Sequence, residues 1–441
     1  MDVTHFNSYL RGGAATAARR LHRALIERGV SSRFQYLEGQ RSSDSQSELA
    51  ETAHFETEWL REGVVAETAA AVRYRIHRQL FKRETAGRAE GTEIFTSPRG
   101  RPKTKWKSTS SARQSIVHLH WVSKFIDYPS FFRSLQPNQP VVWTLHDMNA
   151  FTGGCHFSGS CEQFKSGCGN CPQLKQPHRH DVSHRSFQIK QSSLGTTALH
   201  VVAPSRWLID QARQSPILAN ANSFQRIPYG VPLDDLFPVD RIEAKQQLGI
   251  AAERFVVSFG AMNLASQRKG ASLLVESLSK INARENVACL SFGSGSLDES
   301  MITLPLHHAG YLSDNHQKRL ALSAADVFVL PSLEDNLPLT GLEAMACGTP
   351  VIGFDSGGIP DYVIPGKTGW LAERGNTTQL SRYINAAAEN REQTRVLGKN
   401  ARELIAKSYS SNREASAYIE LYQRLIAERQ ETGSFPERHA A

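Results

Sequence analysis

PSLEDNLPLTGLEAMACGTPVI, the stretch from Pro331 to Ile352, decides the fold prediction. The apolar run 325–330 that precedes it is typical of a buried strand. A polar loop follows, and then a helix that the pattern predicts over Thr340–Cys347, ended by Gly348 and Pro350. A strand, a loop and a helix in this order form the repeating unit of an α/β sheet.

Two carboxylates in this stretch are placed where open α/β sheets bind their ligands. Asp335 lies in the loop after the strand, and Glu343 lies in the helix behind it. Because carboxylates accept strong hydrogen bonds from hydroxyl groups, the two residues indicate a polyhydroxylated ligand. The structural alternatives are that Asp335 caps the helix and that Glu343 is a solvated helix residue.

Strands and helices alternate in two series along the chain. Strands are expected over 3–7, 116–121, 140–145, 199–203, 255–259, 287–292, 325–330 and 350–354, and helices over 14–28, 56–83, 207–213, 271–281, 316–323, 340–347 and 411–428. The segments 39–51 and 97–111 are expected to be irregular, and the chain from Gly433 to fray. A hinge at 227–238 separates the two series, which predict two doubly wound, parallel, Rossmann-like α/β domains.

The bulk composition is that of a globular protein with anionic partners. The 441 residues suit two domains, a hydrophobic content of 40% argues against global disorder, and no run of 18 apolar residues is present. The beginning of the chain lacks a signal-peptide layout, which favours the cytoplasm. The net charge of +8 favours nucleotides or phospholipid headgroups, and no motif supports nucleic acid. Eleven Lys and Arg against three Glu over 73–107 suit either an anionic membrane or a solvated surface.

Four of the six cysteines cluster as Cys155-x5-Cys161-x6-Cys168-x2-Cys171. Disulfides are rare in the cytoplasm, so the cluster first indicates a metal knuckle, and tetrahedral thiolate ligation suits Zn²⁺. Disulfides in an oxidised protein and free thiols in a Gly-rich loop are the alternatives.

The second series resembles a known family. Its motifs run from R-K-G at 268–270 through G-S-G at 293–295, D-N-L-P-x-T-x-L-E-A-M-A-C-G-T-P-V-I at 335–352 and S-G-G-I-P-D at 356–361 to G-x-T-G at 366–369. This order resembles the donor half of family 4 retaining glycosyltransferases, which have the GT-B fold. In the first series, R-G-G-A-A at 11–15, HLHW at 118–121 and the long stretch 141–174 resemble the colanic-acid and exopolysaccharide branch of that family.

The resemblance implies a reaction and an architecture. A sugar would pass from a nucleotide diphosphate sugar to a hydroxyl of a lipid-linked glycan, with retention, at the inner face of the cytoplasmic membrane. An acceptor-binding domain over 1–232 and a nucleotide-sugar-binding domain over 233–410 would face a central cleft, and a C-terminal helix within 411–441 would cross back to the first domain. The family requires no cofactor for catalysis, so a Zn²⁺ ion in the cysteine loop would be structural.

The resemblance also assigns roles to residues of the donor half. Lys269 binds the donor diphosphate and neutralises the leaving group, with Arg268 as a second positive charge. Glu343 accepts hydrogen bonds from the ribose. Asp335 contacts the donor sugar where the family has a glutamate, with Glu334 as the second candidate. Further donor-binding positions are Gly12, Gly13, Gly260, Gly293, Asn336, Leu337, Pro338 and Thr340.

In the first domain the resemblance places His146 close to the reacting sugar and gives Asp147 an acceptor or orienting role. The alternative for His146 is a purely structural histidine. Two rival functions fit the same sequence. One is a same-fold nucleotide-sugar epimerase or phosphorylase, and the other is a zinc-loop binding protein whose catalytic half has decayed.

Overall fold

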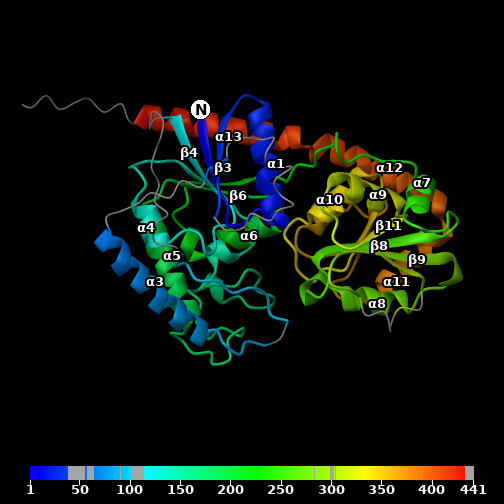
Figure 1. Cartoon of the computed structure of the whole chain (residues 1–441), viewed down its shortest axis with the longest axis horizontal. Helices are drawn as coiled ribbons and strands as arrows, with labels where there is room; N and C mark the ends of the chain where they lie inside the picture. Colours follow the sequence, from blue (N-terminus) through cyan, green and yellow to red (C-terminus); the bar gives the residue numbers. More distant parts are fainter. Residues whose placement is uncertain are drawn as a thin grey trace, which may run out of the picture. The chain divides into compact units, whose positions relative to one another are not determined.

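The computed structural model of the protein describes residues 1–37, 55–56, 64–89, 91–100, 114–282, 284–297, 302 and 304–432. Two compact units make up the chain (Figure 1). Unit 1 contains residues 1–204, 208–227 and 415–441, and unit 2 contains residues 205–207 and 228–414. The predicted loop 39–51, most of the predicted irregular segment 97–111 and the chain from Gly433 lie outside the described residues.

Unit 1 is built on a seven-stranded sheet in the order β3-β2-β1-β4-β5-β6-β7, and all of its strand pairs are parallel. The strands are β1 (Asp2–Phe6), β2 (Ser31–Gln35), β3 (Phe55–Glu56), β4 (Ser115–Leu119), β5 (Val141–Thr144), β6 (Leu199–Ala203) and β7 (Ser223–Arg226). The helices are α1 (Gly13–Glu27), α3 (Val64–Glu84), α4 (Tyr128–Arg133), α5 (Val182–Leu194), α6 (Arg206–Arg213) and α13 (Ser411–Thr432), of which α6 and α13 each have their first residues in unit 2.

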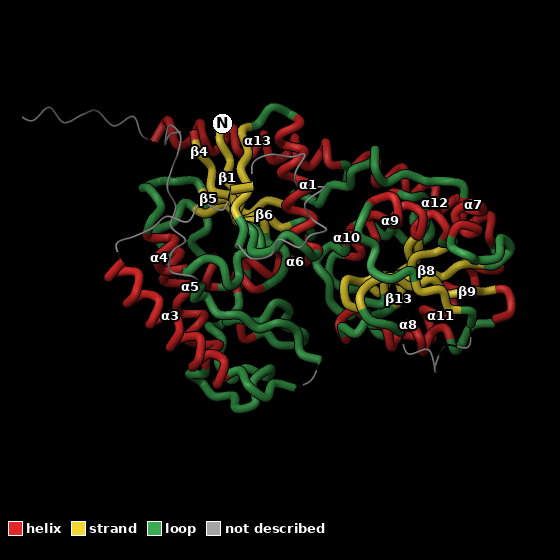
Figure 2. Tube along the Cα trace, viewed as in Figure 1, coloured by secondary structure: helices red, strands yellow, loops and turns green. Residues whose placement is uncertain are grey.

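Unit 2 is built on a six-stranded parallel sheet in the order β10-β9-β8-β11-β12-β13. The strands are β8 (Phe255–Asn263), β9 (Val287–Ser294), β10 (Leu306–His308), β11 (Val327–Leu330), β12 (Val351–Phe354) and β13 (Gly369–Ala372). The helices are α7 (Arg241–Gln247), α8 (Ala271–Leu278), α9 (Asn315–Ala324), α10 (Leu339–Ala346), α11 (Thr377–Glu389) and α12 (Arg391–Ser408). Figure 2 shows the strands of each unit gathered into one sheet with helices around it.

Two of the predicted boundaries are wrong because pairing with distant strands overrides the local pattern. Glu56 was expected to begin a helix, but it lies in β3, where it pairs with Gln35, and helix α3 begins only at Val64. The strand expected over 116–121 ends at Leu119, which is also where its pairing with Phe6 ends. His120 and Trp121 therefore lie in the loop at the carboxyl end of β4.

Helix α13 returns the chain to unit 1, as predicted. Its Tyr418 and Leu421 pack in one buried cluster with Leu21 of α1 and with Ile116 and Val142 of the sheet. Two tyrosine hydroxyls of this helix also reach buried polar groups of the strands: Tyr418 pairs with Thr144 at 2.6 Å and Tyr422 with His118 at 2.6 Å. The C-terminal helix is thus part of the core of unit 1.

The central strands of both sheets are buried on both faces, as expected for doubly wound parallel sheets. In β4 and β11 every residue is buried. Since all strands of a sheet run in parallel, their carboxyl ends meet at one edge, and the loops that leave this edge carry the candidate residues in each unit. Among the described helices, none is long and apolar enough to cross a membrane.

Candidate functional site

In unit 2 the loop after β11 is locked to two neighbouring loops by glycines that leave no room for a side chain. A Cβ atom on Gly270 would lie 1.9 Å from the Pro331 carbonyl oxygen, and one on Gly357 would lie 1.8 Å from that of Asp335. The amide of Leu333 donates to the Arg268 carbonyl at 2.9 Å, and the amide of Gly358 donates to that of Asp335 at 3.0 Å. Backbone contacts therefore fix the loop from both sides.

Three charged side chains meet at this loop. Lys269 ends a short 3-10 helix (Gln267–Lys269) after β8, and its Nζ donates to Oδ2 of Asp335 at 2.5 Å. Arg268 places Nη1 3.6 Å from Oδ1 of the same carboxylate and donates to the carbonyl oxygen of Glu334 at 2.6 Å. Both basic residues of the R-K-G motif thus face Asp335.

The Asp335 carboxylate is ionised although it is largely sealed from water. Its residue is 7% exposed. Burial works against ionisation, but Lys269 and Arg268, together with hydrogen bonds from Lys269 and the Asn336 amide, lower the pKa of Asp335 below its ordinary value. The Lys269 side chain remains 25% exposed.

Glu343 lies in α10, immediately behind this loop, and is buried. The Nζ of Lys318 lies 3.8 Å from its Oε1, so this carboxylate also has a cation beside it. Glu343 is therefore not a solvated helix residue, which was the structural alternative. Glu334 is likewise buried, one residue before Asp335.

The other predicted donor-binding residues are held in place by different kinds of contact. Gly260 and Gly293 allow β8 and β9 to pack closely, since a Cβ on Gly260 would lie 2.1 Å from the Phe292 ring and one on Gly293 1.8 Å from the Ala261 carbonyl oxygen. Asn336 accepts a hydrogen bond from the Ser205 hydroxyl at 2.7 Å. Leu337 is buried, Pro338 precedes the first residue of α10, and Thr340 lies in the first turn of that helix.

In unit 1 the Gly12-Gly13 pair opens helix α1. Gly12 has φ 102°, a conformation that favours glycine, and no side chain caps the helix at this point. A Cβ on Gly13 would meet nothing within 4 Å, so only Gly12 is a glycine for conformational reasons.

A row of histidines connects three neighbouring strands of unit 1. His5 on β1 shares a hydrogen bond of 2.9 Å with His120, which shares one of 3.0 Å with His146. Burial lowers the pKa of His146 to about 4 and those of His5 and His120 well below the ordinary value, so the row is neutral at pH 7.

The far end of the row determines where its protons lie. Nε2 of His5 is buried and has no hydrogen-bond partner among the residues that the structure describes, and a buried N–H group without an acceptor is costlier than a buried lone pair. His5 therefore donates from Nδ1 to Nε2 of His120, which in turn donates from Nδ1 to Nε2 of His146. This leaves His146 with its proton on Nδ1.

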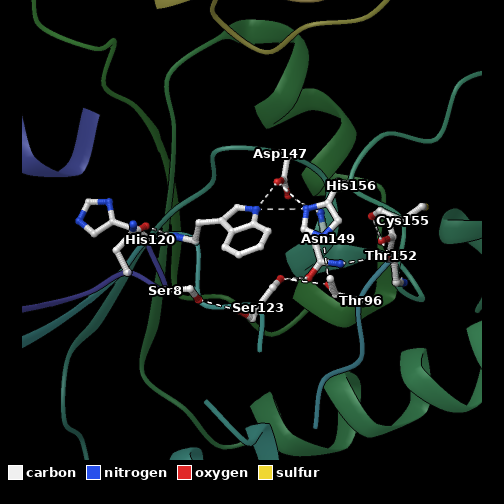
Figure 3. Close-up of polar contacts among 12 residues, drawn as sticks. Ser8, Thr96, His120, Ser123, Asp147, Asn149, Thr152, Cys155 and His156 are labelled. Carbon is white, nitrogen blue, oxygen red and sulfur yellow. Dashed lines mark hydrogen bonds and ion pairs between the residues drawn. The ribbon is translucent and has the colours of Figure 1, made fainter. Parts of the chain in front are cut away.

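Asp147 is the centre of a second network, shown in Figure 3. Its Oδ2 accepts from Nε1 of Trp121 at 2.8 Å and lies 2.7 Å from Nδ1 of His156, and its Oδ1 accepts from the Asn149 amide at 2.8 Å. Burial raises the pKa of this carboxyl, but His156 and the other donors outweigh burial and lower it below the ordinary value. Asp147 is thus an ionised carboxylate whose oxygens already accept hydrogen bonds.

The network extends from His156 into the loop that precedes α4. Nε2 of His156 pairs with the Thr96 hydroxyl at 2.9 Å, and Thr96 donates to Ser123 at 3.1 Å (Figure 3). Sequence reasoning missed His5, Thr96 and His156, because nothing in their local patterns shows that they lie next to predicted site residues. The one available signal was the unusual density of histidines in the strands 3–7 and 116–121.

Solved structures with a similar fold confirm the predicted fold class. The structure of HepE from Anabaena in complex with UDP is 17% identical, with a TM-score of 0.66, over 96% of this chain and 100% of that chain. The structure of WaaG, a glycosyltransferase involved in lipopolysaccharide biosynthesis, is 15% identical, with a TM-score of 0.58, over 95% of this chain and 99% of that chain. The two parallel sheets have the GT-B fold.

Sequence comparison supports the same class of enzyme. Residues 240–404 match the family described as glycosyl transferases group 1, and the protein is a glycosyltransferase. The putative colanic acid biosynthesis glycosyl transferase WcaC of Escherichia coli K12 is 25% identical over 96% of this chain and its own full length. The N-acetyl-alpha-D-glucosaminyl L-malate synthase of Bacillus anthracis is 38% identical, over 25% of this chain and 28% of its own.

The neutral histidine row predicts how stability depends on pH. Each of these residues has a lower pKa in the folded protein than in the unfolded chain, so the unfolded chain takes up more protons as pH falls below about 6.5. We expect the free energy of unfolding to fall by up to about 1.4 kcal/mol per pH unit for each such histidine. The melting temperature should therefore drop between pH 7.5 and pH 5.5.

His5→Asn tests this prediction, since it removes one titrating ring and keeps a polar group near the position of Nδ1. Its melting temperature should fall less steeply with acid than that of the parent protein. His316→Gln, at an exposed position of unit 2, is the control and should keep the parent slope. An unchanged slope in His5→Asn would contradict the prediction.

Proposed function

We propose that the protein is a retaining glycosyltransferase that moves a sugar from a nucleoside diphosphate sugar to a hydroxyl group of a glycan in polysaccharide biosynthesis. The observation that carries the proposal is the meeting of Lys269, Arg268 and Asp335 at the carboxyl ends of β8 and β11. The printed names of similar proteins support the donor and pathway classes: HepE was solved with UDP, and WcaC is described as a colanic acid biosynthesis enzyme.

Lys269 and Arg268 are the groups for the donor diphosphate. The bond between the sugar C1 and the diphosphate oxygen breaks during transfer, so negative charge develops on the leaving group. A cation held in place beforehand stabilises that charge without reorganising during the reaction. Lys269 meets this requirement because Asp335 holds its ammonium group while part of the side chain stays exposed.

Asp335 and Glu343 are the groups for donor hydroxyls. Both are buried carboxylates, and both have an ammonium or guanidinium group beside them that favours the ionised, accepting form. We assign Asp335 to the donor sugar and Glu343 to the ribose. Asp335 is one methylene shorter than the glutamate expected at its position, which makes sugar selectivity the property that this residue controls.

On the acceptor side, His146 would contact the reacting sugar through Nδ1–H, the proton position that the histidine row favours. Asp147 acts as a positioning residue, because its carboxylate already accepts hydrogen bonds from Trp121 and Asn149. The new bond forms between the sugar C1 and the acceptor oxygen on the face that the diphosphate leaves. The acceptor proton passes to the departing diphosphate oxygen, so the reaction needs no covalent enzyme intermediate.

Helix α3 supports a lipid-linked acceptor at an anionic membrane. Its Val72, Ile76 and Leu80 are each more than half exposed and are spaced by four residues, so they form one apolar stripe. Five basic residues of the same helix are exposed, namely Arg73, Arg75, Arg78, Lys82 and Arg83. An apolar stripe among basic side chains suits binding in the plane of an anionic bilayer surface.

Substitution of Lys269 tests the donor site. Lys269→Ala should lower kcat/KM about 100- to 1,000-fold, since it removes a preplaced charge from the leaving group. The measurement is release of nucleoside diphosphate from a panel of nucleotide sugars in the presence of membrane lipid extract. The control is Lys280→Ala, which removes a partly exposed lysine paired with Glu276 on α8 and should change the rate by less than about twofold. Equal rates for Lys269→Ala and the parent protein would refute the assignment.

The anomeric configuration of the product tests the proposed stereochemistry. An α-linked nucleotide sugar should give an α-linked product, because attack occurs on the face from which the leaving group departs. The coupling constant of the anomeric proton in the NMR spectrum of the product distinguishes the two outcomes. A β-linked product would exclude a retaining reaction.

Vesicle binding tests the membrane contact of α3. The triple variant Val72→Ser, Ile76→Ser, Leu80→Ser should cosediment at least about tenfold less with phosphatidylglycerol vesicles, since it removes the buried apolar area of the contact. Val396→Ser changes an equally exposed apolar residue on α12 of unit 2 and serves as the control. Unchanged binding of the triple variant would place any membrane contact elsewhere.

A further inference from the structure

The four clustered cysteines converge on one small pocket of unit 1. All four cysteines line it, together with three glycines, two phenylalanines and three polar residues, namely Cys155, Cys161, Cys168 and Cys171, Gly153, Gly154 and Gly169, Phe95 and Phe164, and Ser158, Gln163 and Ser183. All four are free thiols, and none is highly exposed. Cys155 pairs with Phe95 in an isolated antiparallel β-bridge.

We propose that these four cysteines bind one Zn²⁺ ion, which holds the loop 155–171 against the Asp147 network. Binding would replace the four thiol protons, which pass to solvent, by four Zn–S bonds. The proposal does not rest on the glycosyltransferase reaction, because the ion would be held by protein ligands alone.

One backbone amide of the loop donates to a sulfur atom. Burial raises the pKa of the Cys168 thiol to about 12, and the Gly153 amide, which donates to its Sγ at 3.2 Å, opposes that rise because it stabilises negative charge on sulfur. The turn from Cys168 to Cys171 is unusual, since Cys168 and Asn170 both have positive φ, at 56° and 47°. This conformation turns the thiols of Cys168 and Cys171 into the same pocket.

The stronger observation is a buried cation beside the pocket. Lys190 of α5 is 0% exposed, and its Nζ donates to the carbonyl oxygens of Asn149 and Thr152. The described residues give it no carboxylate within 4.0 Å. A buried ammonium group without an anion is unfavourable, so the structure calls for negative charge nearby.

A zinc–thiolate centre supplies that charge. Four thiolates and one Zn²⁺ carry a net charge of −2, since four negative charges meet two positive ones. Burial lowers the pKa of Lys190 to about 8, and negative charge on Cys155 and Cys168, ahead of Asp147, would raise it. Burial also lowers the pKa of Arg88, and negative charge on Cys171 and Cys155 would raise it, so the centre would favour the charged form of both residues.

A group of three histidines in unit 1 is a poorer metal site, although its ligand atoms lie closer together. Among the described residues, three ligand atoms within 4.8 Å of one another occur at His5, His118 and His120. Both ring nitrogens of His118, however, already pair with Thr144 and Tyr422, at 2.7 and 2.6 Å. A metal there would break these bonds.

An ion bound to Cys155 would also affect the Asp147 network through the next residue in the chain. His156 is the following residue, and it holds the Asp147 carboxylate through Nδ1 while its own carbonyl oxygen accepts from the Met148 amide at 2.9 Å. An ion on Cys155 therefore fixes the position of His156, and through it the carboxylate at the acceptor edge of unit 1.

Metal analysis of the full-length chain, purified without chelator and kept reduced, tests the proposal. We expect about one zinc per chain in the parent protein and less than about a fifth of that in Cys161→Ser. Cys289→Ala, which removes a buried thiol of unit 2, is the matched control and should keep one zinc per chain. Less than half a zinc per parent chain, a full zinc in Cys161→Ser, iron in place of zinc, or disulfides in the reduced protein would each overturn the proposal.

A second measurement covers the case in which Cys161→Ser does not fold. In Co²⁺-substituted protein, tetrahedral thiolate ligation gives sulfur-to-metal charge-transfer bands that nitrogen or oxygen ligation lacks. Cys161→His keeps a ligand at that position, so it should fold, retain one metal per chain and show a weakened charge-transfer band. A spectrum identical to that of the parent would show that Cys161 is not a ligand.

Discussion

The donor edge of unit 2 depends on one constraint, which is that the ionised carboxylate of Asp335 is almost sealed from water. An uncompensated buried charge costs several kcal/mol, so Lys269 and Arg268 must stay beside it. That requirement fixes the loop after β8, and the glycines at 270 and 357 let the neighbouring backbones approach closely enough to satisfy it. The cation that the proposed reaction needs is therefore held in place by the folded protein itself.

Local patterns predicted the parts of the fold that local physics determines. Strand β6 was predicted with its observed ends, and the strand, loop and helix around Asp335 were predicted to within two residues, because apolar runs and breakers set those boundaries. That Asp335 and Lys269 serve one site came from the resemblance of motifs, since 66 residues separate the two side chains and no local pattern joins them. Their ion pair was not predicted.

The remaining parts depend on register between distant strands. Glu56 belongs to the sheet because β3 pairs with β2, where its partner is Gln35. His5 contacts His120 because β1 and β4 are neighbouring parallel strands. The burial of Lys190 also depends on distant parts of the chain, since nothing in the sequence of α5 indicates that this residue is fully buried. A sequence can show that such residues exist, but their neighbours follow only from the assembled sheet.

The two units differ in the charge of the side chains at the carboxyl ends of their strands. Unit 2 presents cations held by buried carboxylates, which suits a site where negative charge develops. Unit 1 presents neutral histidines and a carboxylate, Asp147, that three donors already occupy. In unit 1 the charges are tied together through one residue: the Asn149 amide donates to Asp147, and the Asn149 carbonyl accepts from Lys190. An anion bound beside Lys190 would thus be linked to Asp147 through the backbone of a single residue, Asn149, and the stretch 141–174 connects β5, the carboxylate and the cysteine pocket.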